Sequence, residues 1–246
     1  MTRTALVLAG VRPGGDLLAD FAGVSHKALI PIGGTPMLER VVGALRGSGR
    51  IDRIVISIDR PELVTIADVE VIRSGTSLSD SVVDALNRLG APLLVTTADH
   101  ALLEPEWIRY FLDHVPDKEI AVGLARSDAV MAETPDTKRT FLRFADGAFS
   151  GCNLFHFRSL NVLSAIRLWR VVEAERKKPW KLLRRLGPRE LFAFLTGRLT
   201  LRMALDRVET IAGVSVGAVE LPFGRAAIDV DKPADLILVR RLVEGA

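Results

Sequence analysis

The chain has 246 residues, of which 48% are hydrophobic and 26% charged, with a formal net charge of +3. This length suits one large α/β domain or two small ones, and a single cysteine, Cys152, excludes an internal disulfide framework and is typical of a reducing compartment. No apolar window reaches the roughly 18 residues of a membrane span and no signal-peptide pattern opens the chain, so we expect a cytoplasmic protein.

The first half alternates apolar β-type runs with helical patterns. We expect strands at Ala5–Ala9, Ile54–Ile58, Val69–Ile72, Pro92–Thr97 and Ile120–Ala125. Helices are expected at Met37–Arg46, Ser79–Leu89 and Pro105–His114, with a shorter one near Leu63–Ala67. Continuous apolar strands separated by helices favour an α/β fold with a Rossmann-like, mostly parallel sheet covered on both faces. Ligands bind such sheets at the carboxyl ends of the strands.

The second half is different in character. Strands are expected at Thr140–Phe144, Cys152–Phe157, Val214–Leu221 and Ala226–Val230, and a closing helix at Pro233–Val243. Residues 160–210 are helix-rich and basic, and residues 167–207 hold twelve Lys or Arg against four Asp or Glu, a local net charge of +8. Since no linker or repeat separates this block, we interpret it as a helical insertion within one domain spanning residues 1–246.

A long glycine-containing loop follows the first strand. It starts at Gly10, carries Arg12, and closes with His26 and Lys27. The backbone N–H groups of such a loop can wrap a polyphosphate, whose charge Arg12 and Lys27 would neutralise. The alternative is a turn with a solvated arginine. For His26, packing beneath the loop competes with a phosphate contact.

Three aspartates stand where hard oxygen ligands for Mg²⁺ are expected. Asp99 ends the buried run Leu93–Thr97, although it could instead cap the helix near Pro105. Asp229 and Asp231 are spaced i, i+2 on an expected strand, which would direct both toward one cation. The competing interpretation is that Asp231 only caps the last helix.

The segment RSGTSLSDS, residues 73–81, has small residues leading into a helix. Ser74 and Gly75 allow a flat base to lie against the backbone, and hydroxyl groups such as that of Ser79 can bind its edge. For Ser79 we favour the plainer role of helix N-cap.

Together these segments resemble nucleotidyltransferases of the glycosyltransferase-A-like fold, the group that contains MobA-like enzymes. LVLAG…R…HKALIPIGGTPMLERVV is similar to the family's opening motif, RSGTSLSDSVVDAL to its base-side loop, TTADHALL to its aspartate loop and AIDVDKPADL to its closing motif. The four matches occur in the family's order. The sequence departs from the pattern in the long interval between Arg12 and Lys27 and in His26, which replaces a common proline.

The resemblance implies a reaction and a role for each motif. An acceptor phosphate oxygen would attack the α-phosphorus of an NTP, with CTP and GTP favoured, and pyrophosphate would leave. Leu8, Ala9 and Gly10 would bind the nucleotide, with Gly10 and the loop behind it holding the triphosphate and Arg12 and Lys27 neutralising it. Mg²⁺ would be held by Asp99 with Asp229 or Asp231. We therefore expect Arg12, Lys27 and Asp99 to act in catalysis, and the base to lie near Ser74, Gly75 and Ser79.

The middle segment is expected to bind the acceptor. In the family a Gly-x-Asn at this point lies over the acceptor, which implies that Asn153 hydrogen-bonds it. Lys138 and Arg139 would then hold its phosphate, which belongs to a small molecule or a lipid precursor. Cys152 is better interpreted as a small buried residue than as a nucleophile.

The basic residues 167–207 leave two interpretations open. Their apolar positions either complete the core or rest on an anionic membrane face. No nucleic-acid-binding module accompanies the charge, so we expect no nucleic acid partner. Two other functional classes stay open: a glycosyltransferase of the same fold with a nucleotide-sugar donor, and a non-catalytic nucleotide-binding or membrane-associated scaffold. The glycines at 10, 14 and 15 do not form a dinucleotide fingerprint.

Overall fold

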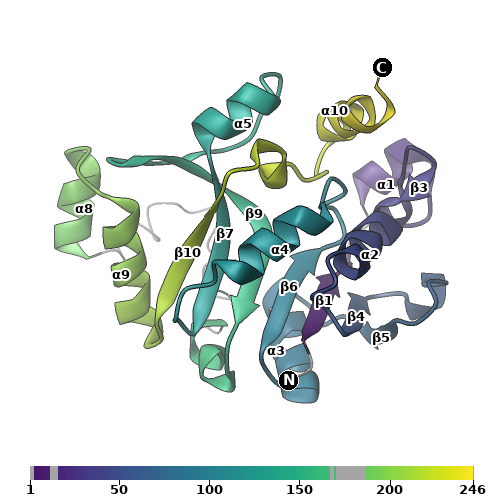
Figure 1. Ribbon diagram of the computed structural model, residues 1–246, viewed down its shortest axis with the longest axis horizontal. Helices are drawn as coiled ribbons and strands as arrows, with labels where there is room; N and C mark the ends of the chain where they lie inside the picture. Colours follow the sequence, from purple (N-terminus) through teal and green to yellow (C-terminus); the bar gives the residue numbers. More distant parts are fainter. Residues whose placement is uncertain (1–2, 12–15, 167–168, 170–186, 246) are drawn as a thin grey trace.

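A computed structural model describes residues 3–11, 16–166, 169 and 187–245. They form an eight-stranded sheet in the order β10-β7-β9-β6-β1-β4-β5, with β8 paired to β9 (Figure 1). All pairings in this sheet are parallel except those of β9 with β6, β7 and β8. The strands are β1 Thr4–Leu8, β4 Arg53–Ile58, β5 Glu70–Arg73, β6 Leu93–Thr97, β7 Ile120–Arg126, β8 Leu142–Phe144, β9 Gly147–Phe157 and β10 Val216–Leu221.

Helices cover both faces of this sheet (Figure 1). The α-helices are α1 Leu17–Ala22, α2 Met37–Gly47, α3 Leu78–Leu89, α4 Pro105–Asp113, α5 Ser127–Glu133, α8 Pro188–Leu195, α9 Leu201–Ala212 and α10 Pro233–Glu244. Short 3-10 helices lie at η1 Lys27–Leu29, η2 Pro61–Leu63, η3 Leu160–Val162 and η4 Gly224–Ala227, and a small hairpin pairs β2 Pro31–Ile32 with β3 Thr35–Pro36.

The alternation of side chains along β1 explains why its sequence is continuously apolar. Ala5 and Val7 pack in the core shared with α2, α4 and α10, whereas Leu6 and Leu8 pack on the opposite face with α3. Successive residues of a strand point to opposite faces, so a strand covered on both sides needs apolar residues at every position. The predicted α/β fold with a mostly parallel, doubly covered sheet is confirmed.

Two predicted elements are wrong. The helix expected near Leu63–Ala67 is absent, because the chain forms only η2 and then reaches β5 through a turn at Ala67 and Asp68, where Asp68 has a φ of +53°. The strand expected at Ala226–Val230 is instead η4 followed by an extended segment that pairs with no described strand. The first two amides of η4, on Gly224 and Arg225, donate to the Glu133 carboxylate at 2.7 and 3.2 Å. The apolar residues here are buried beneath the site rather than in the sheet.

The described part of the basic block packs on the same sheet. Helix α9 lies beside β10, and Ala165, Ile166 and Ala212 belong to the core on the α3 side (Figure 1). Residues 167–168 and 170–186 lie outside the described residues, so the helical prediction there is not addressed. In the part that is described, no helix is long and apolar enough to cross a membrane.

The loops that carry the predicted site lie side by side because the sheet hydrogen bonding continues beyond the strand ends. The amide of Ala9 donates to the Ser57 carbonyl at 2.8 Å, and that of Ala98 donates to the Leu8 carbonyl at 2.9 Å. The amide of Ser74 likewise donates to the Ile58 carbonyl at 2.9 Å. Residues following β1, β4, β5 and β6 therefore meet at one edge of the sheet.

Candidate active site

Lys27 stands at the centre of this edge. It begins η1, and its Nζ lies 2.7 Å from Asp99 Oδ2 and 3.0 Å from Asp231 Oδ1. The lysine side chain is only 17% exposed. Burial alone would lower the pKa of the Lys27 ammonium, but the carboxylates of Asp99 and Asp231 outweigh it and hold the pKa above its usual range. Lys27 is therefore a fixed positive charge that joins two loops.

Asp99 is held in place by its surroundings from three sides. The Thr97 hydroxyl donates to Asp99 Oδ1 at 2.6 Å, and the Val230 amide donates to the Asp99 carbonyl at 3.0 Å. Arg40 Nε donates to the Ala101 carbonyl at 2.9 Å and ties the same loop to α2. The N-cap of α4 is Glu104, so the capping interpretation of Asp99 is wrong.

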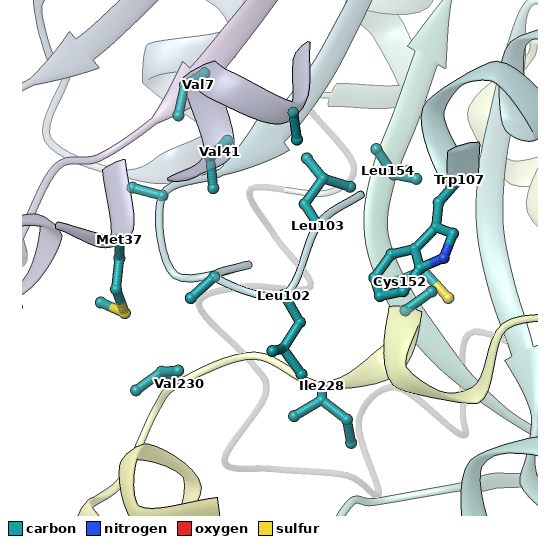
Figure 2. Packing of buried hydrophobic residues seen from close by; sticks show 14 of the residues in the cluster. Val7, Met37, Val41, Leu102, Leu103, Trp107, Cys152, Leu154, Ile228 and Val230 are labelled. Carbon is teal, nitrogen blue, oxygen red and sulfur yellow. The ribbon is translucent and has the colours of Figure 1, made fainter. Parts of the chain in front are cut away.

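The residues after Asp99 fill the core beneath the site. Leu102 and Leu103 are buried, and the Leu102 side chain points toward Ile228 of the C-terminal segment (Figure 2). Val230 lies in the same cluster. Apolar packing under the loop and the Val230–Asp99 backbone hydrogen bond above it fix the two aspartate-bearing segments to each other.

Asp229 and Asp231 face different cations. Asp229 forms an ion pair with Arg139 Nη1 and accepts from Asn153 Nδ2 at 2.9 Å, whereas Asp231 contacts Lys27. The expectation that one strand directs both aspartates to one point is wrong, because the segment is not a strand. The capping role of Asp231 is also wrong: the N-cap of α10 is Lys232, whose amide donates to Asp235.

The environment of Asp229 sets it apart from an ordinary surface carboxylate. Burial raises the pKa of Asp229 to about 6, although the adjacent Arg139 guanidinium opposes this effect. Asn153, on β9, has a φ of +48°, a left-handed conformation rare for residues other than glycine. That backbone turns the Asn153 amide toward Asp229. The structure thus brings together Arg139, Asn153 and Asp229, while Lys138 is exposed beside them.

The base-side loop lies against the opening loop. A Cβ on Gly10 would lie 2.8 Å from Ser74 Oγ, so only glycine fits where the two loops meet. Gly75 is just as confined, since its Cβ would lie 2.8 Å from Asp80 Cβ. Ser77, not Ser79, caps α3 by accepting from the Asp80 amide; Ser79 is buried with its Oγ 2.9 Å from Ser77 Oγ. The predicted cap at Ser79 is therefore wrong.

The remaining predicted residues occupy different situations. The side chains of Leu8 and Ala9 are buried in the core. Arg12 lies outside the described residues, and its role stays a prediction from the sequence. Within the residues that the structure describes, no group of three or more His, Cys, Asp or Glu side chains is placed to hold a metal ion. Asp99, Asp229 and Asp231 are held instead by Lys27 and Arg139.

Sequence reasoning missed Asp59, which follows β4 at the same edge. Its Oδ1 accepts from the Val11 amide at 3.0 Å and lies 3.1 Å from His26 Nε2. His26 is 2% exposed, which agrees with the expectation that it packs beneath the loop. The signal was available: Asp59 ends a buried apolar run in the same way as Asp99 does.

The comparison with known proteins decides between the functional classes. Residues 20–186, more than half of the chain, match the MobA-like NTP transferase domain. The chain belongs to this family. A hypothetical transferase from Thermus thermophilus is 33% identical to it, with 96% of this chain and 100% of that chain covered and a TM-score of 0.84. The protein is therefore an enzyme, a nucleotidyltransferase that uses an NTP.

More distant solved structures share the fold. The 2-C-methyl-D-erythritol 4-phosphate cytidylyltransferase from Thermus thermophilus is 16% identical, with 99% and 100% of the two chains covered and a TM-score of 0.55. A CMP:2-keto-3-deoxy-manno-octonic acid synthetase complexed with CTP is 15% identical, with 100% and 99% covered and a TM-score of 0.61. The predicted nucleotidyltransferase family is confirmed.

Proposed function

We propose that this enzyme, acting as one cytoplasmic domain, is a Mg²⁺-dependent nucleotidyltransferase for a phosphorylated acceptor. An acceptor phosphate oxygen attacks the α-phosphorus of the NTP, the bond from that phosphorus to the α,β-bridging oxygen breaks, and pyrophosphate leaves. The observation that carries the proposal is the meeting of Lys27, Asp99 and Asp231, from three distant segments, at the carboxyl edge of the sheet. No acid–base residue is required, because the acceptor phosphate is already ionised at neutral pH.

Lys27 supplies the charge that such a reaction needs. Two anions must approach each other, and a buried ammonium offsets their repulsion and the charge of the transition state. In the structure this ammonium is neutralised by Asp99 and Asp231. Triphosphate binding would draw Lys27 toward the phosphates and release the two carboxylates, which frees them for a metal ion.

The carboxylates fit a Mg²⁺ site of the kind that nucleotides complete. Mg²⁺ is usually held by one or two carboxylates together with substrate phosphates and water, so a three-carboxylate cage is not needed. Asp99 would be one ligand, and Asp229 or Asp231 the other. When bound, Mg²⁺ would neutralise the phosphate oxygens and orient the α-phosphorus.

The acceptor would bind beside Asp229. Arg139 and Asn153 contact Asp229, and Lys138 is the exposed residue that precedes Arg139; all three carry the N–H donors that a phosphate requires. The acceptor is a phosphorylated small molecule or a lipid precursor. No nucleic acid is needed.

The base would lie on the segment from Ser74 to Ser79, whose small side chains and close contact with Gly10 leave backbone groups near the nucleotide loop. CTP and GTP are the favoured donors. For CTP, the support is that the cytidylyltransferase and the CTP-complexed synthetase named above share this fold.

A second proposal concerns the surface formed by α8. Phe192 and Leu195 are 64% and 72% exposed and are flanked by the exposed Arg189 and Arg198, whereas Ala193 on the opposite side is buried. The core therefore does not absorb all the apolar side chains of this helix. We propose that α8 rests on an anionic membrane surface, as aromatic and basic residues of amphipathic helices do.

A thermal-shift panel tests the main proposal. ATP, CTP, GTP and UTP are each added with and without Mg²⁺ to the wild type and to Asp99→Asn. A ligand at 100 times its Kd adds about 2.7 kcal/mol of stability, which gives a clear rise in Tm. We expect one NTP to stabilise the wild type only with Mg²⁺ and to lose this effect in the variant. Stabilisation by nucleotide-sugars alone would favour a glycosyltransferase.

Repeating the panel with two further variants identifies the second ligand. Asp229→Asn and Asp231→Asn each remove one candidate charge at nearly constant volume. The variant that no longer responds to Mg²⁺ locates the ligand.

A further inference from the structure

Both described ends of the opening loop are attached to the end of β4. The Val11 amide, directly after Gly10, donates to Asp59 Oδ1 at 3.0 Å, and His26 Nε2 reaches the same oxygen at 3.1 Å. The next residue, Arg60, donates from its guanidinium to the Ser25 carbonyl. Asp59 and Arg60, two consecutive residues, thus hold both the start of the opening loop at Val11 and its end at Ser25 and His26.

The hydrogen bonds of His26 define its protonation. The Ala28 amide donates to His26 Nδ1 at 3.1 Å, so Nδ1 carries no proton and Nε2–H is the donor to Asp59. By accepting from Ala28, His26 is the N-cap of η1, in which Lys27 is the first residue. The orientation of η1, and with it the direction of the Lys27 side chain, therefore depends on a buried ring held by Asp59.

Asp59 also contacts the base-side loop. Its backbone carbonyl accepts from Arg73 Nη1 at 3.0 Å, and Arg73 immediately precedes Ser74, which lies against Gly10. Partial burial would raise the pKa of the Asp59 carboxyl, but hydrogen bonds from Val11 and His26 outweigh it and keep the pKa below its usual range. The Asp59 carboxylate is thus a stable anion that accepts hydrogen bonds from both the Val11 amide and His26 Nε2–H.

We propose that Asp59 is a positioning residue for nucleotidyl transfer, which through the Val11 amide and His26 sets the phosphate-binding backbone and Lys27 before the NTP arrives. This inference rests on the proposed function of the same site. The physical reason is preorganisation: a displacement of about 1 Å in a group that must meet the reacting phosphate can cost roughly a hundredfold in rate. The side chain of Asp59 itself need not touch the substrate.

The test compares Asp59→Ala and Asp59→Asn with the wild type. Glu70→Gln is the matched control, because Glu70 is an exposed carboxylate on neighbouring β5 that pairs only with Arg53 among the described contacts. Backbone hydrogen exchange at Val11 and Ala28 is measured together with kcat and KM for the preferred NTP. We expect faster exchange at both amides and a tenfold to hundredfold lower kcat/KM in Asp59→Ala.

The conservative variant separates positioning from overall stability. The asparagine side chain introduced by Asp59→Asn keeps an oxygen that accepts an N–H, so this variant should recover part of both effects, whereas Glu70→Gln should behave as the wild type. Unchanged exchange at Val11 and Ala28, or a lower Tm with unchanged kcat/KM, would overturn the inference. If the wild type releases no pyrophosphate with any NTP, the proposed function fails, and the exchange rates still decide whether Asp59 holds the loop.

Discussion

At the scale of single residues, the site is built from charged side chains that contact more than one partner. Lys27 serves two carboxylates, and Asp229 receives both Arg139 and Asn153. Such an arrangement is stable because the largely buried Lys27, Asp99 and Asp229 each have a partner of opposite charge, and Asp231, which is 57% exposed, also contacts Lys27. The same ion pairs can also exchange partners, since a triphosphate would offer negative charge to Lys27 and a divalent cation would offer positive charge to the carboxylates.

Removing the central charges should stop turnover. We expect Lys27→Met to lower kcat by about 10²–10³-fold, because one preorganised group aimed at developing negative charge contributes this much. Asp99→Asn should cause a loss of similar size, and both variants should keep the wild-type circular dichroism spectrum. Lys118→Met is the control, since Lys118 pairs with Glu209 away from the site. Full pyrophosphate release by either site variant would show that the site is misplaced.

His100, directly after Asp99, should make the fold sensitive to acid. Burial lowers the pKa of this histidine from 6.5 to about 4, although the Asp99 carboxylate and the Ala226 backbone oppose this effect. The native state thus favours the neutral ring. The resulting stability is fully present above pH 6.5 and is lost as the pH falls toward 4.

Urea unfolding at about pH 7.5 and about pH 4.5 measures this effect. We expect His100 to account for about 2–3 kcal/mol of the free energy of unfolding lost between these pH values. His100→Phe keeps a ring beside Trp107, 6.1 Å away in the wild type, and should lack that share of the loss. Equal pH dependence in both proteins would contradict the assignment.

At the scale of elements, helix starts position the site loops. Ser77 caps α3, and its carbonyl accepts from Ser81 Oγ, which in turn accepts from the Gly75 amide. The cap and the base-side loop therefore form one hydrogen-bonded unit. Weakening the cap should therefore disturb the nucleotide site as well as the helix.

A pair of cap variants tests this link. Ser77→Ala should cost about 1 kcal/mol of unfolding free energy and also raise the Kd for the preferred NTP. Thr200→Ala removes the cap of α9, far from the loop in the fold, and should cost a similar amount without changing the Kd. Both quantities come from urea unfolding and nucleotide titration. An unchanged Kd in Ser77→Ala would show that the cap does not contribute to NTP binding.

The elements also show what the sequence could predict. The apolar runs of β1, β4 and β6 had to be buried strands, and the residues that follow them had to lie at one edge of the sheet. The segment from Ala226 to Val230 has the same composition, yet it is not a strand because Glu133 anchors the amides just before it across the sheet edge. Two features could not be predicted, because they depend on tertiary contacts that no local sequence pattern reveals. They are the contacts of Lys27 with Asp99 and Asp231 and the position of Asp59 beneath His26.

At the scale of the whole molecule, α8 lies at one side of the fold (Figure 1), and the side chains of its Arg189, Phe192 and Leu195 are exposed. Vesicles with and without anionic lipid test its proposed role by co-sedimentation. We expect pelleting with anionic vesicles only, and its loss in the double variant Phe192→Ser, Leu195→Ser. Ile237→Ser is the control, since Ile237 is 60% exposed on α10. Equal, negligible pelleting of the wild type with both vesicles would contradict membrane binding.

The Lys27–Asp231 contact joins residues 204 positions apart. Arg240 of α10 also reaches back to the carbonyl of Pro31, which lies close to Lys27 in the sequence. On a ribosome-bound chain that has exposed the sheet but not yet these last segments, Lys27 would be paired with Asp99 alone and would lack its second carboxylate, Asp231. We therefore expect NTP transfer to begin only after Asp231 has left the ribosome and joined Lys27.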